Sequence, residues 1–230
     1  MTRAYPSLFA TACLCAAPCL LVAALLLASA NASAGFFKTI TIDGDYSDWD
    51  DVPVVDSDAA DNAGFVDFAD TKIAHDDDFL YIYNSFHTAQ SLGAFTALDV
   101  DSDVATGFDV FGLGLIGSEA GWQNDFPFTQ DAGSFNNGSG MAGDFFGSGA
   151  ALLTPFADGF ERELSISLDI VFNAGGDVFA DDTFSLLFWT DLGAGDVTGA
   201  IAYELTPIPE PTTLLLAAAG LASVYGRRRR

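Results

Sequence analysis

Basic residues are scarce in this 230-residue chain, and most of them lie at its ends. Lys and Arg together number 8 against 32 acids, which gives a formal net charge of −24. Between residues 35 and 206, three basic residues stand against 31 acids, so this central part carries a net charge of −28. Such a body repels a phosphate backbone and an anionic membrane surface, which excludes nucleic acid as a partner. Cation binding, a neutral partner, or a surface kept soluble by its charge remains compatible with it.

Cysteine and histidine are equally limited. The three cysteines all lie within residues 13–19, and the only histidines are His75 and His87. Once the N-terminal segment is removed, disulfides, thiolate metal sites and cysteine nucleophiles are excluded. The histidines form no metal-ligand motif, and no serine-hydrolase, Walker or dinucleotide fingerprint is present. A glycoside hydrolase that uses two carboxylates is the remaining enzymatic alternative, and sequence gives no geometry to support it.

Residues 1–34 are typical of a secretory signal peptide. Arg3 supplies a positive start, an apolar run extends over 8–27, and small residues at 28–30 and 32–34 offer two A-x-A cleavage sites. The mature chain then begins between Asn31 and Gly35. An uncleaved membrane anchor is the alternative.

The C-terminal segment, residues 207–230, has three parts in a fixed order. A Pro-Glu-Pro triplet precedes an apolar run over 212–225, which is shorter than the roughly 20 residues that span a bilayer comfortably. Four consecutive arginines follow and hold their end in the cytoplasm under the positive-inside rule. The residues that carry this pattern are Pro209, Glu210, Pro211, Arg227, Arg228, Arg229 and Arg230.

This tripartite segment resembles the PEP-CTERM sorting signal of Gram-negative bacteria. The resemblance implies export across the inner membrane, transient anchoring through a C-terminal transmembrane helix, and processing by an exosortase-type membrane protease. The protein would then be released or attached at the cell surface, or in an extracellular polysaccharide matrix. A plain membrane anchor is the alternative.

The central part, residues 35–206, is predicted to be one all-β domain, a two-sheet antiparallel β-sandwich. It shows no amphipathic helix, and short β-branched and aromatic runs alternate with Gly/Asp/Asn/Ser clusters. Strands at 79–85 and 183–189 are apolar on both faces, which indicates central strands in a two-sheet core. Residues 131–149, rich in Gly, Ser and Asn, are predicted to form a long loop. The other predicted strands are 37–42, 66–74, 94–100, 110–116, 160–168 and 200–205.

Three short motifs follow one another in this domain. The first is Ile42-Asp43-Gly44-Asp45-Tyr46-Ser47-Asp48-Trp49, a turn after a strand. The second, Asp76-Asp77-Asp78-Phe79-Leu80-Tyr81-Ile82-Tyr83, is a polar turn that leads into an aromatic strand. The third, Asp99-Val100-Asp101-Ser102-Asp103-Val104-Ala105-Thr106-Gly107, follows a strand. In this order they resemble family 9 carbohydrate-binding modules and the wider DOMON-like β-sandwich group. The resemblance spans about residues 38–206 and implies a noncatalytic, carbohydrate-binding sandwich; Asp103 replaces the commoner Asn.

The acids of the third motif alternate along the chain, as oxygen ligands do in loops that wrap around Ca²⁺, a cation that takes roughly 6–8 oxygens. The EF-hand pattern fails because its sixth position would be Val104 and its twelfth Val110. We therefore predict a calcium site that the fold completes, and the alternative is a solvated acidic turn. The candidate ligands are Asp99, Asp101, Asp103, Thr106 and Asp109.

A sugar site needs an aromatic face beside hydrogen-bonding side chains. The best local set is Trp122, Gln123, Asn124 and Asp125, while Trp49 and Trp189 are further candidates with core packing as their alternative. The sequence therefore predicts an exported, surface-sorted, noncatalytic protein that binds carbohydrate. A structural or adhesive matrix protein cross-linked by divalent cations is the second hypothesis.

Overall fold

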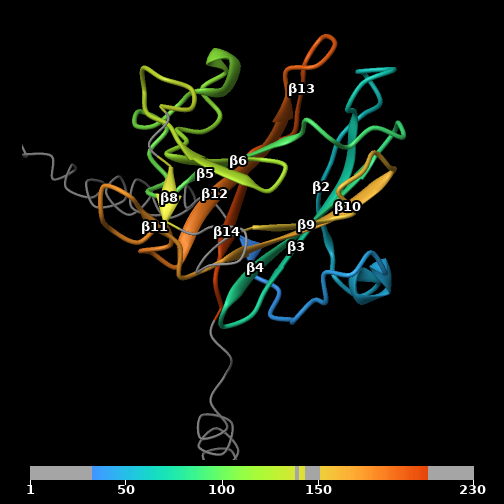
Figure 1. Ribbon diagram of the computed structural model, residues 1–230, viewed down its shortest axis with the longest axis horizontal. Coiled ribbons are helices and arrows are strands. Elements are labelled where there is room, and N and C mark those ends of the chain that lie inside the picture. Colours follow the sequence, from blue (N-terminus) through green and yellow to red (C-terminus); the bar gives the residue numbers. More distant parts are fainter. Residues whose placement is uncertain (1–32, 138–139, 143–150, 207–230) are drawn as a thin grey trace, which may run out of the picture. The chain divides into compact units, whose positions relative to one another are not determined.

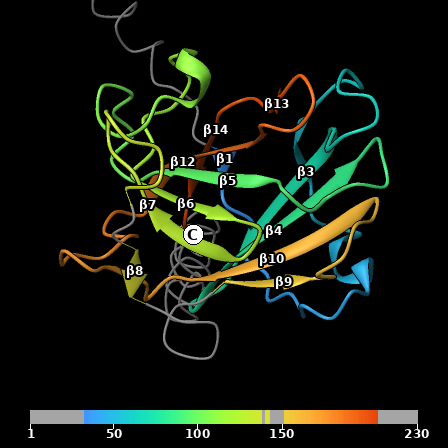
Figure 2. The same ribbon diagram turned by 45° about the horizontal axis from the view of Figure 1, so that its top comes forward.

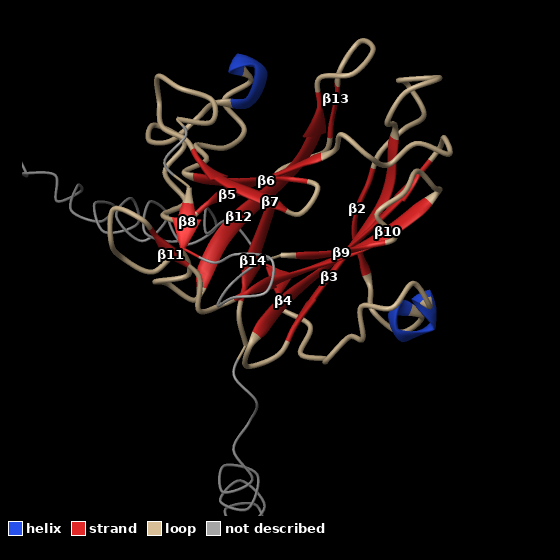
Figure 3. Cartoon of the chain, in the orientation of Figure 1, coloured by secondary structure: helices blue, strands red, loops and turns tan. Residues whose placement is uncertain are grey.

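The computed structural model describes residues 33–137, 140–142 and 151–206. Strands in two sheets account for nearly all of its regular structure (Figures 1 and 3). Among the described residues, the helices are two short 3-10 turns, η1 (Tyr46–Trp49) and η2 (Val110–Gly112). No helix in this part of the chain has the length and apolar character needed to cross a membrane. The predicted all-β class is confirmed.

The first sheet has the order β1-β14-β12-β5-β6-β7, with β13 paired to β12. All its pairings are antiparallel except that of β1 with β14. Its strands are β1 (Ser33–Ala34), β5 (Phe95–Asp99), β6 (Ala120–Gln123), β7 (Phe126–Thr129), β12 (Thr183–Thr190), β13 (Asp196–Val197) and β14 (Ile201–Glu204).

The second sheet is fully antiparallel, with the order β2-β3-β4-β10-β9. A short two-stranded ribbon, β8 with β11, stands apart from both sheets. The strands of the second sheet and the ribbon are β2 (Val54–Ser57), β3 (Phe68–His75), β4 (Phe79–Phe86), β8 (Met141–Ala142), β9 (Leu152–Thr154), β10 (Glu161–Ser167) and β11 (Val171–Phe172).

The two sheets share one apolar core, and Figure 2 shows them as two layers. In β4, Leu80 and Ile82 point into this core, and in β12 Phe184, Leu186 and Phe188 do the same. Phe68 of β3 and Phe188 of β12 meet across the interface with ring centroids 6.3 Å apart. The β-sandwich predicted from the sequence is therefore confirmed.

The outer faces of both sheets are covered as well. On the second sheet, Tyr81 and Tyr83 join Trp49 in a smaller buried cluster. On the first sheet, Leu187 and Trp189 join Phe95 in another, where the rings of Phe95 and Trp189 stack at 4.2 Å. This second layer of burial explains why the strand sequences are apolar on both faces.

A buried carboxylate holds the first motif against the second sheet. Glu163 of β10 has no exposed surface. Its Oε1 accepts hydrogen bonds from the backbone N–H groups of Asp43 (2.8 Å) and Gly44 (2.7 Å), and its Oε2 accepts one from Trp49 Nε1 (3.0 Å). The first motif therefore forms a structural cap, in which Trp49 is a core residue and is not exposed to a ligand.

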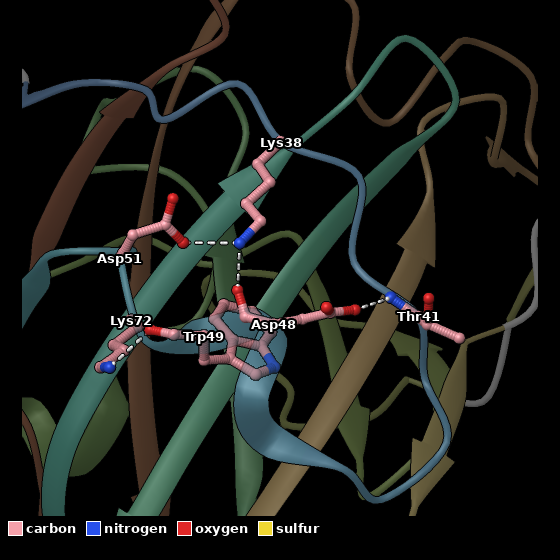
Figure 4. A network of polar contacts seen from close by, with 6 residues as sticks. All are labelled: Lys38, Thr41, Asp48, Trp49, Asp51 and Lys72. Atoms are coloured by element: carbon pink, nitrogen blue, oxygen red, sulfur yellow. Dashed lines mark hydrogen bonds and ion pairs between the residues drawn. The ribbon is translucent and has the colours of Figure 1, made fainter.

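Two lysine side chains also stabilise the cap through hydrogen bonds and an ion pair (Figure 4). Lys38 Nζ donates to the Asp48 carbonyl and forms an ion pair with Asp51. Lys72 Nζ donates to the carbonyl of Trp49 at 2.7 Å, and the Thr41 N–H donates to the Asp48 carboxylate at 3.0 Å. These bonds close the turn over the Trp49 ring.

Two of the predicted strands are wrong. Residues 37–42 run extended along β3 but form only one bridge, between Phe37 and His75, because the chain turns away to place the cap. Residues 110–116 contain η2 and loop instead of a strand, since Phe111 and the glycines at 112 and 114 adopt positive φ. Strands β2, β6, β7 and β9, and the shorter β1, β8, β11 and β13, are absent from the prediction.

Several predictions fall wholly or partly outside the described residues. The signal peptide at 1–34 and the sorting segment at 207–230 with its helix lie there, apart from the two residues of β1. Of the predicted loop at 131–149, residues 131–137 and 140 are without strands, and β8 follows at 141–142.

Replacing Glu163 tests the cap. In the variant Glu163→Gln, the amide would present an N–H to Trp49 Nε1, which leaves a buried donor without an acceptor. We expect a loss of about 1–3 kcal/mol in the free energy of unfolding, measured by urea denaturation. Glu204→Gln, at an exposed position, serves as the control and should change stability little; equal effects in both variants would contradict the role given to Glu163.

Candidate functional site

The loop after β5 is built from short-range turns. The N–H of Asp103 donates to Asp101 Oδ1 at 2.9 Å, and the N–H of Ala105 donates to Asp103 Oδ1 at 3.0 Å. The N–H of Thr106 then donates to the Asp103 carbonyl at 3.0 Å. Asp side chains favour such local bonds, so the alternating acids fold the loop back on itself.

Two glycines let this loop approach the segment before β6. A Cβ at Gly117 would lie 2.1 Å from the Thr106 carbonyl, and a Cβ at Gly107 would lie 2.4 Å from the backbone of Gly117. Phe108 and Ser118 exchange backbone hydrogen bonds of 2.7 and 3.0 Å beside this contact. Only glycine allows the two backbones to pack so closely, and the packing brings Glu119 to the loop.

Three carboxylates meet at this point. Asp99, Asp101 and Glu119 each offer an oxygen within 4.8 Å of the others. Thr106 Oγ1 lies 2.9 Å from Glu119 Oε1 and 3.2 Å from both oxygens of Asp101, although its hydroxyl carries a single hydrogen. We call Asp99, Asp101, Thr106 and Glu119 the oxygen cluster.

One carboxylate oxygen at the buried end of the oxygen cluster has no hydrogen-bond partner. Asp99 is 1% exposed; its Oδ2 accepts a bond from the Gly117 N–H at 3.2 Å, but its Oδ1 has none. Burial, and after it the charge of Asp101, raises the pKa of Asp99. Burial also raises the pKa of Glu119, with smaller contributions from Asp101 and Asp99. A cation of the calcium type fits this set of oxygens, because it would satisfy the free lone pairs and offset the repulsion.

The structure brings together three of the five predicted calcium ligands. Asp99, Asp101 and Thr106 lie in the oxygen cluster. The Asp103 carboxylate instead accepts the Ala105 N–H, and the Asp109 carboxylate accepts the Gly114 N–H at 2.8 Å. Glu119 is absent from the predicted ligands, because it lies beside Asp99 only through the pairing of β5 with β6, and no strand was predicted at 120–123.

The predicted sugar-binding set forms a hairpin. Trp122 has no exposed surface and its ring lies in the central core, so it presents no face to a sugar. Asn124 is the turn residue, with φ +56° and its Oδ1 bound to the Gly93 N–H. Asp125 is buried with Oδ2 unpartnered, and Gln123 is exposed. The other two tryptophans, Trp49 and Trp189, are 1% and 5% exposed.

A pocket lies next to the oxygen cluster. It has a volume of about 270 Å³. Amide side chains, one carboxylate and one ring surround it, from the ends of β7 and β11 and from the loops next to β6, β7, β8 and β11. Its lining residues are Glu119, Thr129, Gln130, Asn137, Gly140, Phe172, Asn173, Ala174 and Gly175. We call it the amide pocket.

Gln130 is the buried polar group of the amide pocket. It is 4% exposed, and its Nε2 donates to Ser118 Oγ while its Oε1 has no partner. Exchanging the two ends of the amide would still leave one polar atom unpartnered. Neighbouring atoms cover this Oε1, so a ligand hydroxyl, which can donate or accept, would satisfy the amide after a small movement of the pocket wall. The half-buried ring of Phe172 offers an apolar surface in the same pocket.

A second group of acids lies on the loop before β3 and on β13. Asp61, Asp67 and Asp196 have carboxylate oxygens within 4.8 Å of one another, and Asp67 and Asp196 are buried. No ion pair joins them to a basic side chain in the described part of the chain. Burial, and after it the nearby charge of Asp58, raises the pKa of Asp196 to about 6.

Comparison with known proteins gives one family match. Residues 207–230 match the PEP-CTERM protein-sorting motif. The segment predicted from its Pro-Glu-Pro, apolar and arginine parts is therefore confirmed, and it marks the chain as an exported protein sorted to the cell surface by an exosortase. No curated protein matches the chain.

Two similar solved structures are both described as a family 9 carbohydrate binding module from Caldicellulosiruptor kristjanssonii. The one in complex with glucose is 16% identical, with a TM-score of 0.41 over 73% of this chain and 84% of that one. The one in complex with cellotriose is 15% identical, with a TM-score of 0.39 over 73% and 82% of the two chains.

The raised pKa of Asp196 predicts a pH dependence of stability. The folded state holds this proton more tightly than the unfolded chain, so the contribution is present below about pH 4 and is lost as the pH rises through about 6. We expect the unfolding midpoint, measured in chelator, to fall over this range. Asp58→Asn removes the neighbouring charge and should flatten the fall, whereas the exposed control Asp169→Asn should not. Equal slopes in all three proteins would refute the assignment.

Proposed function

We propose that the protein is a noncatalytic, surface-sorted β-sandwich that binds neutral carbohydrate in its amide pocket. The observation that carries the proposal is Gln130, whose buried amide lacks one hydrogen-bond partner at the wall of a pocket of about 270 Å³. An unpartnered buried polar atom costs about 1–3 kcal/mol, which a ligand hydroxyl would offset. The sorting motif supports the proposal, because it marks the chain for the cell surface, and we take extracellular polysaccharide as the partner there.

Neutral ligands suit the charge of the domain. The central part carries −28, and the amide pocket itself includes the carboxylate residue Glu119. An anionic polysaccharide would be repelled by this field. A single carboxylate among the lining residues also does not supply the pair that glycoside hydrolysis uses, which supports a binding role.

We further propose that Ca²⁺ occupies the oxygen cluster. Asp99, Asp101 and Glu119 supply carboxylate oxygens and Thr106 a hydroxyl, and Asp99 Oδ1 is buried without a partner. Hard oxygen donors of this kind are the ones that Ca²⁺ prefers.

A second candidate function is cation-dependent association in a matrix. All three basic side chains of the central part serve internal contacts: Lys38 and Lys72 bind the cap, and Arg162 is buried against Asn84. The surface is therefore almost uniformly negative, and copies of the protein repel one another unless divalent cations bridge them.

An oligosaccharide array tests the carbohydrate proposal. We expect purified protein to retain neutral oligosaccharides, cellotriose among them, and Gln130→Ala to weaken binding tenfold or more. Gln123→Ala is the matched control, since Gln123 is exposed on the β6–β7 hairpin and outside the pocket. Loss of binding in Gln123→Ala alone would place the site at the hairpin, and no binding by the wild type would reject the function.

Light scattering tests the association candidate. If divalent cations bridge the acidic surfaces, millimolar Ca²⁺ should raise the apparent mass and a chelator should reverse the change. The matrix function requires this in the absence of any oligosaccharide. A constant apparent mass in Ca²⁺ and in chelator would eliminate it.

A further inference from the structure

Glu119 belongs to two sites at once. Its carboxylate is a member of the oxygen cluster, where Oε1 accepts from Thr106 Oγ1 at 2.9 Å and Oε2 accepts from the Val100 N–H at 3.1 Å. The same residue lines the amide pocket. Any shift of Glu119 therefore acts on both sites.

The contact continues into the wall of the amide pocket. The backbone carbonyl of Glu119 accepts the backbone N–H of Gln130 at 2.9 Å, so the residue that carries the unpartnered side-chain amide is bonded through its backbone to the residue at the cation site. Ser118, the neighbour of Glu119, accepts the Gln130 side chain. Both bonds that position Gln130 therefore come from adjacent residues on the segment that carries Glu119.

We propose that cation binding in the oxygen cluster controls carbohydrate binding in the amide pocket, with Glu119 as the positioning residue between them. The inference rests on the proposed function, since it concerns regulation of the same pocket. The cation is a divalent ion with a preference for oxygen ligands, and Ca²⁺ is the probe that represents it.

The coupling is positive for two physical reasons. Without a cation, the Glu119 carboxylate faces Asp99 and Asp101, and the repulsion favours positions of Glu119 other than the one described. A bound cation attracts all three carboxylates and holds Glu119 in the position described. Ser118 and Gln130, which form one wall of the amide pocket, are then ordered before the ligand binds. The ligand then meets an ordered pocket, and by linkage it raises the affinity for the cation by the same factor.

Calorimetric titrations of the full chain measure the effect of Ca²⁺ on carbohydrate affinity and the effect of carbohydrate on Ca²⁺ affinity. Cellotriose is titrated in chelator and in saturating Ca²⁺, and Ca²⁺ is titrated with and without saturating cellotriose. We expect Ca²⁺ to increase cellotriose affinity about fivefold or more, and cellotriose to increase Ca²⁺ affinity by the same factor. A repeat with Mg²⁺ should give a smaller effect, because Mg²⁺ demands a tighter octahedral site.

Three matched acid-to-amide variants identify the residues involved. Asp101→Asn should abolish the effect of Ca²⁺, and because it removes one source of the repulsion on Glu119, the affinity measured in chelator should equal or exceed that of the wild type. Asp103→Asn and Asp109→Asn remove the same charge from the same loop, but their carboxylates bind turn N–H groups outside the oxygen cluster. Both should keep the wild-type coupling.

The possible failures are distinguishable. Cellotriose binding of equal strength with and without Ca²⁺ overturns the coupling and leaves the carbohydrate function standing. Failure of the whole oligosaccharide array in both conditions overturns the function and the coupling together. Titration of Ca²⁺ alone still decides the metal site, and an effect lost equally in all three variants would assign the coupling to general charge instead of Glu119.

Discussion

The buried carboxylate of Glu163 is the constraint on which the arrangement of the second sheet depends. A charge without exposed surface needs several donors, and the chain supplies three from the first motif, 114 to 120 residues earlier. Without these donors the buried Glu163 charge would have no hydrogen-bond partner. The first motif must therefore pack against β10. The same bonds place Trp49 over Tyr83 and thereby cover the outer face of that sheet.

Strand β10 buries a base as well as an acid, on opposite faces. Arg162 is enclosed in the molecule, where it donates to Asn84 Oδ1 and lies over the Phe86 ring, and burial lowers its pKa to about 9. It pairs with no acid among the described residues. The central domain therefore uses its few basic groups for its own construction, and the pair Lys38–Asp51 is the one ion pair among the described residues. An external cation is the natural counter-charge for such a molecule.

Much of the fold was accessible to sequence analysis because the strands are long and apolar. The runs at 79–85 and 183–189 carry an alternating pattern on both faces, and β4 and β12 lie where they were predicted. The site was less accessible. Strands β6 and β7 are only four residues each and include Gly121 and Pro127, which weaken the local signal. Without them, Glu119 could not be paired with Asp99, and Gln130 could not be placed beside a pocket.

The sequence by itself determined the C-terminal sorting motif, the all-β class and the acidic character of the domain. Each of these depends on local sequence or on composition. They follow from the Pro-Glu-Pro, apolar and arginine order at 207–230, from the alternation within strands, and from the near absence of basic residues. Only the tertiary structure decided which acids meet and which aromatic rings reach solvent. The carboxylates of Asp103 and Asp109 accept backbone N–H groups of the turns in which they lie, and Trp122 is buried between the sheets. Glu119 lies beside Asp99 and Asp101 through the pairing of β5 with β6, and it also lines the amide pocket. Such contacts depend on strand pairing and on close glycine packing, which act between residues that are distant in the sequence.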